Sequence, residues 1–149
     1  MLQEKKNISG DLKIIYHKIN SLYSSYAKSV GLNYPFILVL QILCDPSQVY
    51  TQKAICDELE LPKQLVNSIV KTLWEQGYIE LEEAKDRRNK EIFLTQHGKR
   101  YAAKILKPLA EAEDAALKDV TFTELTNLII FMEKYRKTLK NAIKKQGAK

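Results

Sequence analysis

The sequence has little glycine and proline and no long apolar run. Five Gly and four Pro among 149 residues are few for a loop-rich or all-β protein, because turns depend on these residues. The longest apolar run, Phe36 to Leu40, ends at Gln41, whereas a membrane-spanning helix needs about 18 apolar residues or more. Hydrophobic residues make up 45% and charged residues 28%, which are ordinary globular values. These values exclude a disordered or fibrous chain.

Cysteine is scarce, and the first residues do not have the pattern of a secretory signal. Cys44 and Cys56 are the two cysteines, too few for a disulfide framework. The first residues, MLQEKKNISGDLK, contain no apolar segment of the length that a signal peptide requires. We therefore expect a cytoplasmic protein without a membrane segment, folded as one domain over residues 1–149.

Motifs for catalysis and metal binding are also missing. The two histidines, His17 and His97, are far apart, and the chain has no Cys-x-x-Cys or His-Glu-x-x-His. It also lacks a Gly-x-Gly-x-x-Gly or phosphate-binding loop. The sequence predicts a protein that is not an enzyme and that has no cofactor and no metal site.

The net charge of +6 arises mainly at the C-terminal end. Residues 134–149 contain seven Lys and Arg residues and no acid, so residues 1–133 have 17 cations against 18 acids, a net charge of −1. A basic C-terminal helix is more often a solvated face than a specific site. Any signal for nucleic-acid binding must therefore come from local clusters of charge.

Apolar residues recur every three or four positions over most of the chain, which predicts helices. Thr51, Thr95 and either Thr121 or Thr123 suit helix N-caps, and Pro62 suits a first helical position. Pro108, inside the fifth predicted helix, should kink it. The predicted helices cover residues 8–30, 34–44, 51–59, 62–76, 95–119 and 121–145.

Between the fourth and fifth of these helices the apolar period changes to two. Residues 78–82 and 91–94 alternate apolar and polar side chains and predict two strands of a hairpin, which we call the wing. The connection between the strands is polar and basic. A helix, a tight turn, a second helix and a basic hairpin follow one another as in a winged helix-turn-helix. We expect a mainly α fold with a small two-stranded β-hairpin.

The predicted helix 62–76 and the wing carry the candidate nucleic-acid contacts. The outward positions of this helix carry side chains that can hydrogen-bond to base edges in a major groove. Lys85, Arg87, Arg88 and Lys90 of the wing suit phosphate or minor-groove contacts. Two alternatives stay open: these residues form an ordinary solvated face, or the winged helix binds protein, which the −1 charge of residues 1–133 favours.

From Tyr50 to Gly98 the chain resembles the DNA-binding core of the MarR (multiple antibiotic resistance regulator) family of transcription factors. The matching segments are TQKAICDELELPKQLVNSIVKTLWEQGYIE and DRRNKEIFLTQHG. The second contains the family's wing pattern, Asp-x-Arg and then a strand ending in Leu-Thr-x-x-Gly, as Asp86, Arg88, Leu94, Thr95 and Gly98. Leu65 and Ser68 depart from the family, which commonly has Thr and Arg there, so the operator sequence does not carry over.

The resemblance implies a sequence-specific regulator that binds double-stranded DNA at a pseudo-palindromic operator. Repression until a small aromatic effector releases the DNA is the family's usual mode. The resemblance also implies a homodimer, with dimerisation helices at 8–33 and 95–145, a winged helix-turn-helix at 34–94 and a basic tail at 146–149. In the family the wing Arg enters the minor groove and is oriented by the Asp, here Arg88 and Asp86. The expected DNA contacts are Lys53, Lys63, Gln64, Asn67, Ser68, Lys71, Arg87, Arg88 and Lys90.

Tyrosines and cysteines leave two further alternatives open. The family binds effectors between the dimer helices and the winged domain, which suggests a pocket formed by Tyr16, Tyr23, Tyr26, Tyr34 and Trp74. The same tyrosines equally suit a dimer interface, and Trp74 suits packing of its helix against its neighbours. A thiol-based redox sensor needs an exposed cysteine in electropositive surroundings. We expect Cys44 and Cys56 to be buried instead.

Overall fold

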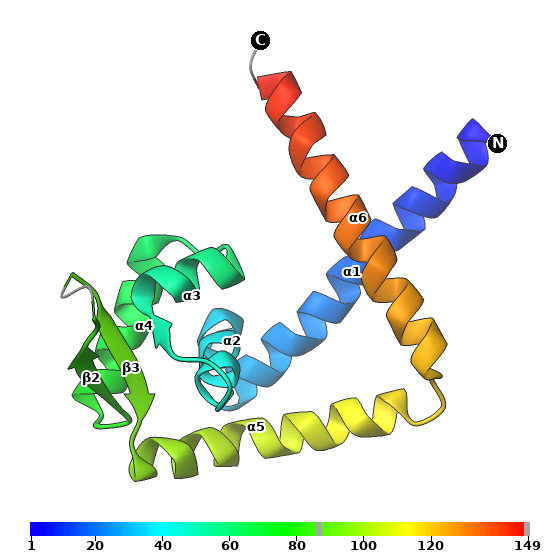
Figure 1. Ribbon diagram of the computed structural model, residues 1–149. Coiled ribbons are helices and arrows are strands. Elements are labelled where there is room, and N and C mark those ends of the chain that lie inside the picture. Colours follow the sequence, from blue (N-terminus) through cyan, green and yellow to red (C-terminus); the bar gives the residue numbers. More distant parts are fainter. Residues whose placement is uncertain (86–87, 148–149) are drawn as a thin grey trace. The chain divides into compact units, whose positions relative to one another are not determined.

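The computed structural model describes residues 1–85 and 88–147, with the side chain of Leu2 left out of the account. The chain forms two compact units, Met1–Ala110 and Glu111–Lys149. The elements, which Figure 1 labels except for β1, are α1 (Leu2–Ser29), α2 (Tyr34–Leu43), β1 (Tyr50–Thr51), α3 (Gln52–Leu59), α4 (Lys63–Glu75), β2 (Ile79–Glu83), β3 (Lys90–Leu94), α5 (Gln96–Leu117) and α6 (Phe122–Gly147).

The first unit is a winged helix-turn-helix, which confirms the predicted fold class. The predicted hairpin is present: β2 and β3 pair antiparallel, with Ile79 opposite Leu94 and Glu83 opposite Lys90. The sheet nevertheless has three strands in the order β1-β3-β2, because β1 pairs with the free edge of β3. The two-stranded prediction missed β1, since two residues are too short to show a period.

The core of the first unit lies where α2, α3 and α4 meet the inner face of the sheet (Figure 1). Ile37 and Leu40 of α2, Ile55 of α3 and Leu73 of α4 are fully buried. Ile79 and Ile92 cover them from the sheet, and Ala27 adds α1 to the core. This core fixes how α3, α4 and the wing are positioned relative to one another.

Several helix ends lie within a residue or two of the predicted positions. The Thr51 hydroxyl accepts a hydrogen bond from the Ala54 N–H and caps α3, as expected. Pro62 is the N-cap of α4 and not its first residue, and α4 ends at Glu75. Gly77 then adopts φ +68°, a left-handed conformation that glycine reaches without strain. α1 begins at Leu2, well before the predicted start, because residues 3–6 are good helix formers that carry no apolar period.

The segment Leu94-Thr95-x-x-Gly98 joins the sheet to α5. The Thr95 hydroxyl donates to the Gly77 carbonyl at 2.8 Å and accepts from the Gly98 N–H at 2.9 Å. The Thr95 N–H donates to the Tyr78 carbonyl at 3.0 Å. A Cβ on Gly98 would lie 1.8 Å from that carbonyl oxygen. The pattern therefore has a structural reason: α5 begins in backbone contact with the turn between α4 and β2.

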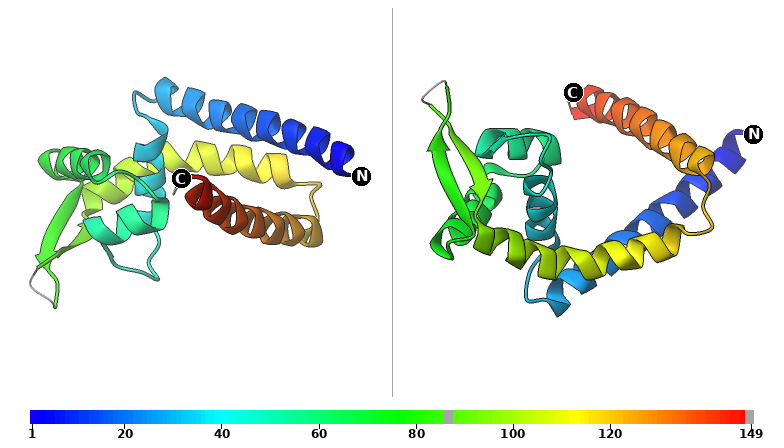
Figure 2. Two further views of the ribbon diagram at one scale, coloured as in Figure 1. Left: turned by 90° about the horizontal axis from the view of Figure 1, so that it is seen from above. Right: turned by 60° about the horizontal axis from the view of Figure 1, so that its bottom comes forward.

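The second unit contains the end of α5 and the whole of α6, which runs as one continuous helix in both views of Figure 2. Thr121 is the cap, and Thr123 lies within the helix. The Glu124 carboxylate accepts from the Thr121 N–H at 2.8 Å, which is a capping box. Since α6 extends to Gly147, residues 146 and 147 belong to a helix rather than to the predicted tail. No described helix is long and apolar enough to cross a membrane.

Candidate nucleic-acid interface

The outward face of α4 is polar from Lys63 to Lys71, as predicted. Val66, Ile69, Val70 and Leu73 are buried, which turns the opposite side of the helix toward solvent. Five exposed side chains on that side can donate hydrogen bonds to base edges or accept hydrogen bonds from them. They are Lys63, Gln64, Asn67, Ser68 and Lys71.

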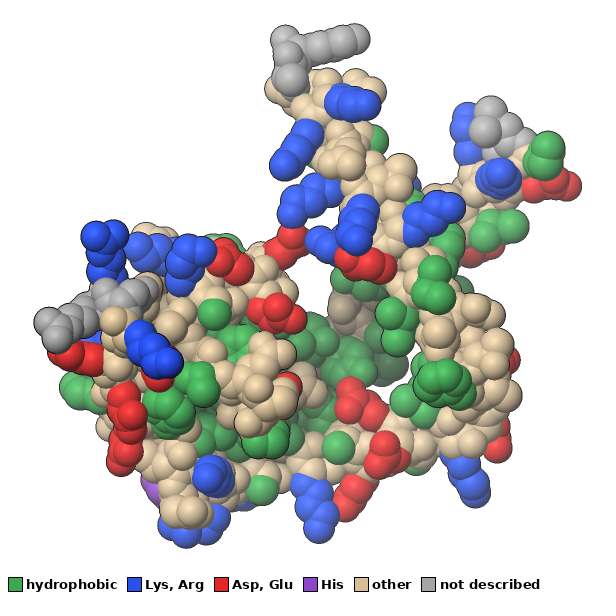
Figure 3. All heavy atoms as spheres, in the orientation of Figure 1, with side chains coloured by type: hydrophobic (Ala, Val, Ile, Leu, Met, Phe, Trp, Pro, Cys, Tyr) green, Lys and Arg blue, Asp and Glu red, His purple; other side chains and the backbone are tan. Residues whose placement is uncertain are grey.

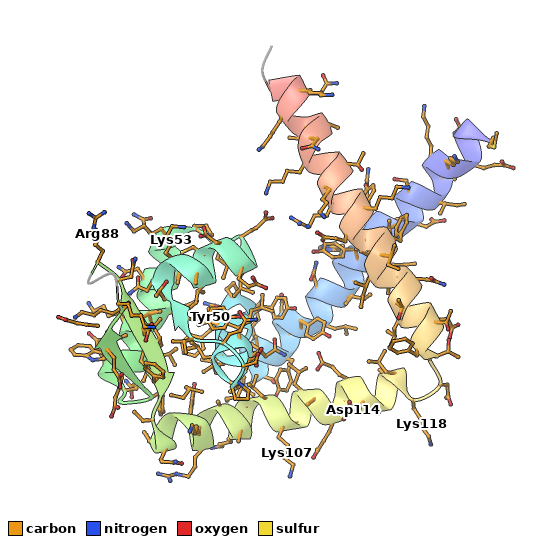
Figure 4. The ribbon with its side chains drawn as sticks, in the orientation of Figure 1. Tyr50, Lys53, Arg88, Lys107, Asp114 and Lys118 are labelled. Carbon is orange, nitrogen blue, oxygen red and sulfur yellow. The ribbon has the colours of Figure 1, made fainter. Side chains whose placement is uncertain are left out.

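A groove of about 560 Å³ is lined by α3, the start of α4 and the wing. Four cationic side chains line it: Lys53 of α3, Lys63 of α4, and Arg88 and Lys90 of the wing. Figure 4 shows Lys53 and Arg88 at the same edge of this unit, and Figure 3 shows basic side chains gathered there. Of the described residues that line the groove, none is acidic. The fold thus gathers positive charge from three separate segments.

Two of the candidate lysines have carboxylate partners within their own helices. The Lys53 ammonium donates to Asp57 at 2.6 Å, and this hydrogen bond raises the pKa of Lys53. The Lys71 ammonium lies 3.7 Å from the Glu75 carboxylate. Both pairs are largely exposed, so each contributes little to stability. Their effect is to hold two flexible cations near the surface of α3 and α4.

The structure brings some of the predicted residues together and leaves others apart. Lys53, Lys63, Arg88 and Lys90 share the groove, whereas the remaining α4 residues lie on the open face of that helix. Asp86 and Arg87 lie outside the described residues, so the predicted orientation of Arg88 by Asp86 stays a prediction. Four other residues line the groove that sequence reasoning did not assign to it: Gln52, Cys56, Leu81 and Asn89.

Comparison with known proteins places this geometry in a family. Residues 31–89 match the model of the MarR family. A MarR family regulator from Neisseria meningitidis has a similar structure, with a TM-score of 0.80, 29% sequence identity, and coverage of 92% of this chain and 96% of that one. Residues 31–89 are a MarR family domain.

Two further structures share the fold over most of the chain. A MarR/EmrR family transcriptional regulator from Acinetobacter sp. ADP1 has a TM-score of 0.69 at 24% identity, covering 92% of this chain and 97% of that one. A putative MarR family transcriptional regulator from Listeria monocytogenes, crystallised with a 26mer DNA, has a TM-score of 0.68 at 22% identity, with coverage of 89% and 88%. No curated protein matches the chain.

The tyrosines near the MarR family domain mostly hold helices together. The Tyr26 hydroxyl donates to the Ile105 carbonyl at 2.6 Å, which ties α1 to α5. Tyr23 and Tyr34 stack with ring centroids 5.1 Å apart, which ties α1 to the start of α2. Tyr16 is exposed. The predicted pocket for an aromatic effector, which also included Trp74, therefore stays a prediction.

Two sequence predictions are wrong: that Trp74 packs its helix against neighbouring helices, and that Cys44 is buried. Trp74 is 56% exposed on the outer side of α4 and does not pack this helix against its neighbours. Cys44, at the end of α2, is exposed rather than buried, although nearby atoms still desolvate the thiol and raise its pKa. Cys56 is half-buried, so it is neither a core residue nor fully accessible.

Within residues 1–85 and 88–147, no group of three His, Cys, Asp or Glu side chains could hold a metal ion.

Proposed function

We propose that the protein is a transcriptional regulator that binds specific sequences of double-stranded DNA. The observation that carries the proposal is the polar face of α4 beside a groove lined by four cations. A helix of this kind fits the major groove, and the wing reaches the adjacent minor groove. The MarR family match and the DNA-bound relative from Listeria monocytogenes support the same reading. The proposal includes a cytoplasmic location for the protein, because a regulator of this kind must reach the DNA that it binds.

The DNA contacts proposed here divide into two kinds. Gln64, Asn67 and Ser68 on α4 read base edges, because amide and hydroxyl groups can both donate and accept hydrogen bonds. Lys53, Lys63, Lys71, Arg87 and Lys90 contact phosphates, and Arg88 enters the minor groove, guided by Asp86. Contacts of the first kind select the operator, while those of the second kind supply most of the affinity.

A homodimer is part of the proposal. Large apolar side chains are exposed along α1 and α6, among them Leu22, Phe122 and Ile129. Within the described residues, α6 buries no side chain. On each helix, exposed apolar residues in this number are unusual for a monomer and mark an interaction surface. A two-fold partner would cover it and would place two copies of α4 on the half-sites of a pseudo-palindromic operator.

Repression, and release by a small aromatic effector, complete the proposal. Both come from the resemblance to the family rather than from a cavity at the tyrosines. Because the coupling between two ligands is reciprocal, an effector that weakens DNA binding must itself bind more weakly to the DNA complex. Titration of the protein with phenols and aromatic acids, with and without DNA, tests this part separately.

The decisive experiment is selection of bound fragments from genomic DNA, followed by fluorescence anisotropy with a selected duplex and a shuffled one. The proposal predicts that the selected duplex binds tighter by about 10³-fold or more at physiological salt. The double variant Gln64→Ala and Asn67→Ala should lose this preference, whereas Gln96→Ala, an exposed amide at the start of α5, should keep it. Equal binding of both duplexes, with a shallow dependence on salt, would instead favour a winged helix that binds protein.

A further inference from the structure

The first half of α5 carries positive charge without any acidic residue. Residues 1–94 contain 12 Lys and Arg and 12 Asp and Glu, so their net charge is zero. Residues 95–110 contain four Lys and Arg and no acid, a net charge of +4, and the next acid along the chain is Glu111. The proposed DNA contacts include none of these four cations, which are Lys99, Arg100, Lys104 and Lys107.

Three of the four cations form a stripe along the outer side of α5. Four buried residues mark the inner side of this helix: Gly98, Ala102, Ile105 and Leu109. Because successive residues are turned by about 100°, positions 100, 104 and 107 lie on the opposite side, and all three side chains are exposed. Positions i, i+4 and i+7 span about 10 Å along a helix axis. We call Arg100, Lys104 and Lys107 the α5 stripe.

The placement of these charges is unfavourable for α5 itself. The N-terminal end of a helix carries a partial positive charge, so acids stabilise its first turn and cations destabilise it. The first turn of α5 has no acid and contains Lys99, which Arg100 follows directly. Within residues 1–85 and 88–147, no carboxylate forms an ion pair with Lys99, Arg100 or Lys104. Such a departure from favourable helix chemistry is typical of residues that serve a binding site.

An aromatic cluster lies beside the N-terminal end of the α5 stripe. Tyr78, from the turn between α4 and β2, stacks on Tyr101 with ring centroids 4.0 Å apart, and its centroid lies 4.8 Å from that of His97. His97 is exposed and lies three positions before Arg100, so the two share one side of the helix. Since Tyr78 already stacks on Tyr101, that face of its ring is closed to a nucleic-acid base. Arg and Tyr together are instead enriched where proteins bind one another.

The α5 stripe lies away from the proposed DNA interface. Figure 4 shows Lys107 pointing outward from α5, whereas Lys53 and Arg88 lie at the opposite edge of the first unit. A duplex held by α4 and the wing therefore leaves the stripe uncovered. The stripe follows the convex outer side of one helix, so it suits an extended partner better than a small anion.

We propose that the α5 stripe, together with His97, binds an acidic helix of another protein. A helix with Asp or Glu at positions i, i+4 and i+7 presents carboxylates on one side, at the spacing of the three cations. The guanidinium of Arg100 is able to hold one of these carboxylates through two parallel hydrogen bonds. The interaction goes beyond the proposed function, because it gives the protein a second binding surface that stays accessible while DNA is bound.

Fluorescence anisotropy with a labelled synthetic peptide tests the proposal in the full-length protein. The peptide is an alanine-based helix whose Glu residues recur at i, i+4 and i+7, and the control peptide has the same composition with its Glu residues spread around the helix. The patterned peptide should bind about tenfold tighter, as for one additional hydrogen bond to a charged group. Equal affinity for both peptides would show only a general attraction between opposite charges and would overturn the proposal.

Substitutions locate the peptide on the protein, because other basic surfaces also attract an acidic peptide. The double variant Arg100→Gln and Lys104→Gln should lose about tenfold or more in affinity for the patterned peptide, with a melting temperature no lower than that of the wild type. Arg100→Lys keeps the charge but loses the two parallel hydrogen bonds, so its affinity should be intermediate. Lys144→Gln with Lys145→Gln, which removes two exposed cations of α6, is the matched control and should bind the peptide like the wild type.

The remaining outcomes separate this proposal from DNA binding. Wild-type affinity for the peptide in the double variant, or loss of affinity in the α6 control, would place the peptide elsewhere and overturn the proposal. The double variant should keep its affinity for a selected duplex; a loss there would make the stripe a nucleic-acid surface and contradict the proposal as well. Peptide binding is measured without DNA, so this test stands even if the proposed function fails.

Discussion

The backbone contact at Gly98 offers a sharp test of the fold. A methyl group added there would lie 1.8 Å from the carbonyl oxygen and 2.7 Å from the carbonyl carbon of Tyr78. These atoms belong to the backbone, so no side-chain rotation can relieve the overlap. The start of α5 must move away from the turn between α4 and β2.

The cost of Gly98→Ala follows from what this movement breaks. Overpacking of this kind typically costs about 1–3 kcal/mol. The Tyr78 carbonyl also accepts the Thr95 N–H at 3.0 Å, and loss of a hydrogen bond costs about 1 kcal/mol more. A destabilisation of about 2–4 kcal/mol is expected, which corresponds to a drop in Tm of about 4–16 °C for a chain of this size.

Gly10→Ala is the matched control for this measurement. Gly10 lies inside α1, and nothing is within 4 Å of the position of an added Cβ. The same substitution should therefore stabilise the protein by about 0.5–1 kcal/mol, because alanine loses less conformational freedom in a helix. Both variants are melted at one protein concentration, as assembly shifts Tm. A Gly98→Ala protein as stable as the wild type would refute the packing argument.

Three further predictions concern burial, assembly and pH. Leu73→Ala should lower the free energy of unfolding, measured in urea, by about 2–5 kcal/mol, because Leu73 is buried. Trp74→Ala should lower it by less than about 0.5 kcal/mol, because Trp74 is exposed. Equal losses in the two variants would contradict the described orientation of α4. Ile129→Lys should convert a sedimenting dimer into a monomer, whereas Asn127→Lys, about 200° away around α6, should leave it intact. The hydrogen bond from Arg136 lowers the pKa of Glu133 from 4.5 to about 2. The stabilising effect of the ionised carboxylate is therefore present above pH 4.5 and is lost as the pH falls toward 2. In thermal melts Glu133→Gln should reduce the dependence of Tm on acid pH, and an unchanged pH profile would count against the ion pair.

The sequence predicted the helices and the wing because burial imposes a period on each. The buried residues Val66, Ile69, Val70 and Leu73 give α4 its helical pattern, and their positions also define its polar face. Such patterns say less about elements that lack a period. The two residues of β1 and the early polar turns of α1 belong to this class, and the sequence predicted neither.

The candidate site could be predicted only in part, because its residues come from distant segments. The sequence identified Lys53, Lys63, Arg88 and Lys90 one by one as basic residues, but their convergence on one groove depends on how α3, α4 and the wing pack. Trp74 shows the opposite limit: its size suggested packing, yet its angular position on α4 leaves it exposed. Whether an aromatic side chain is buried depends on neighbours that the local sequence does not name.

The central claim is that the protein binds DNA through α4 and the wing rather than through the basic end of α6. Titration of one selected duplex between 50 and 200 mM salt tests it, with Arg88→Ala compared against a variant in which Lys140, Lys144 and Lys145 are all Gln. We predict that wild-type affinity falls by about 10³-fold or more over this range, as for six or more phosphate contacts. Arg88→Ala should lose affinity equivalent to about 1–3 kcal/mol at fixed salt, and the α6 variant much less. Full loss in the α6 variant, with Arg88→Ala binding like the wild type, would contradict the account.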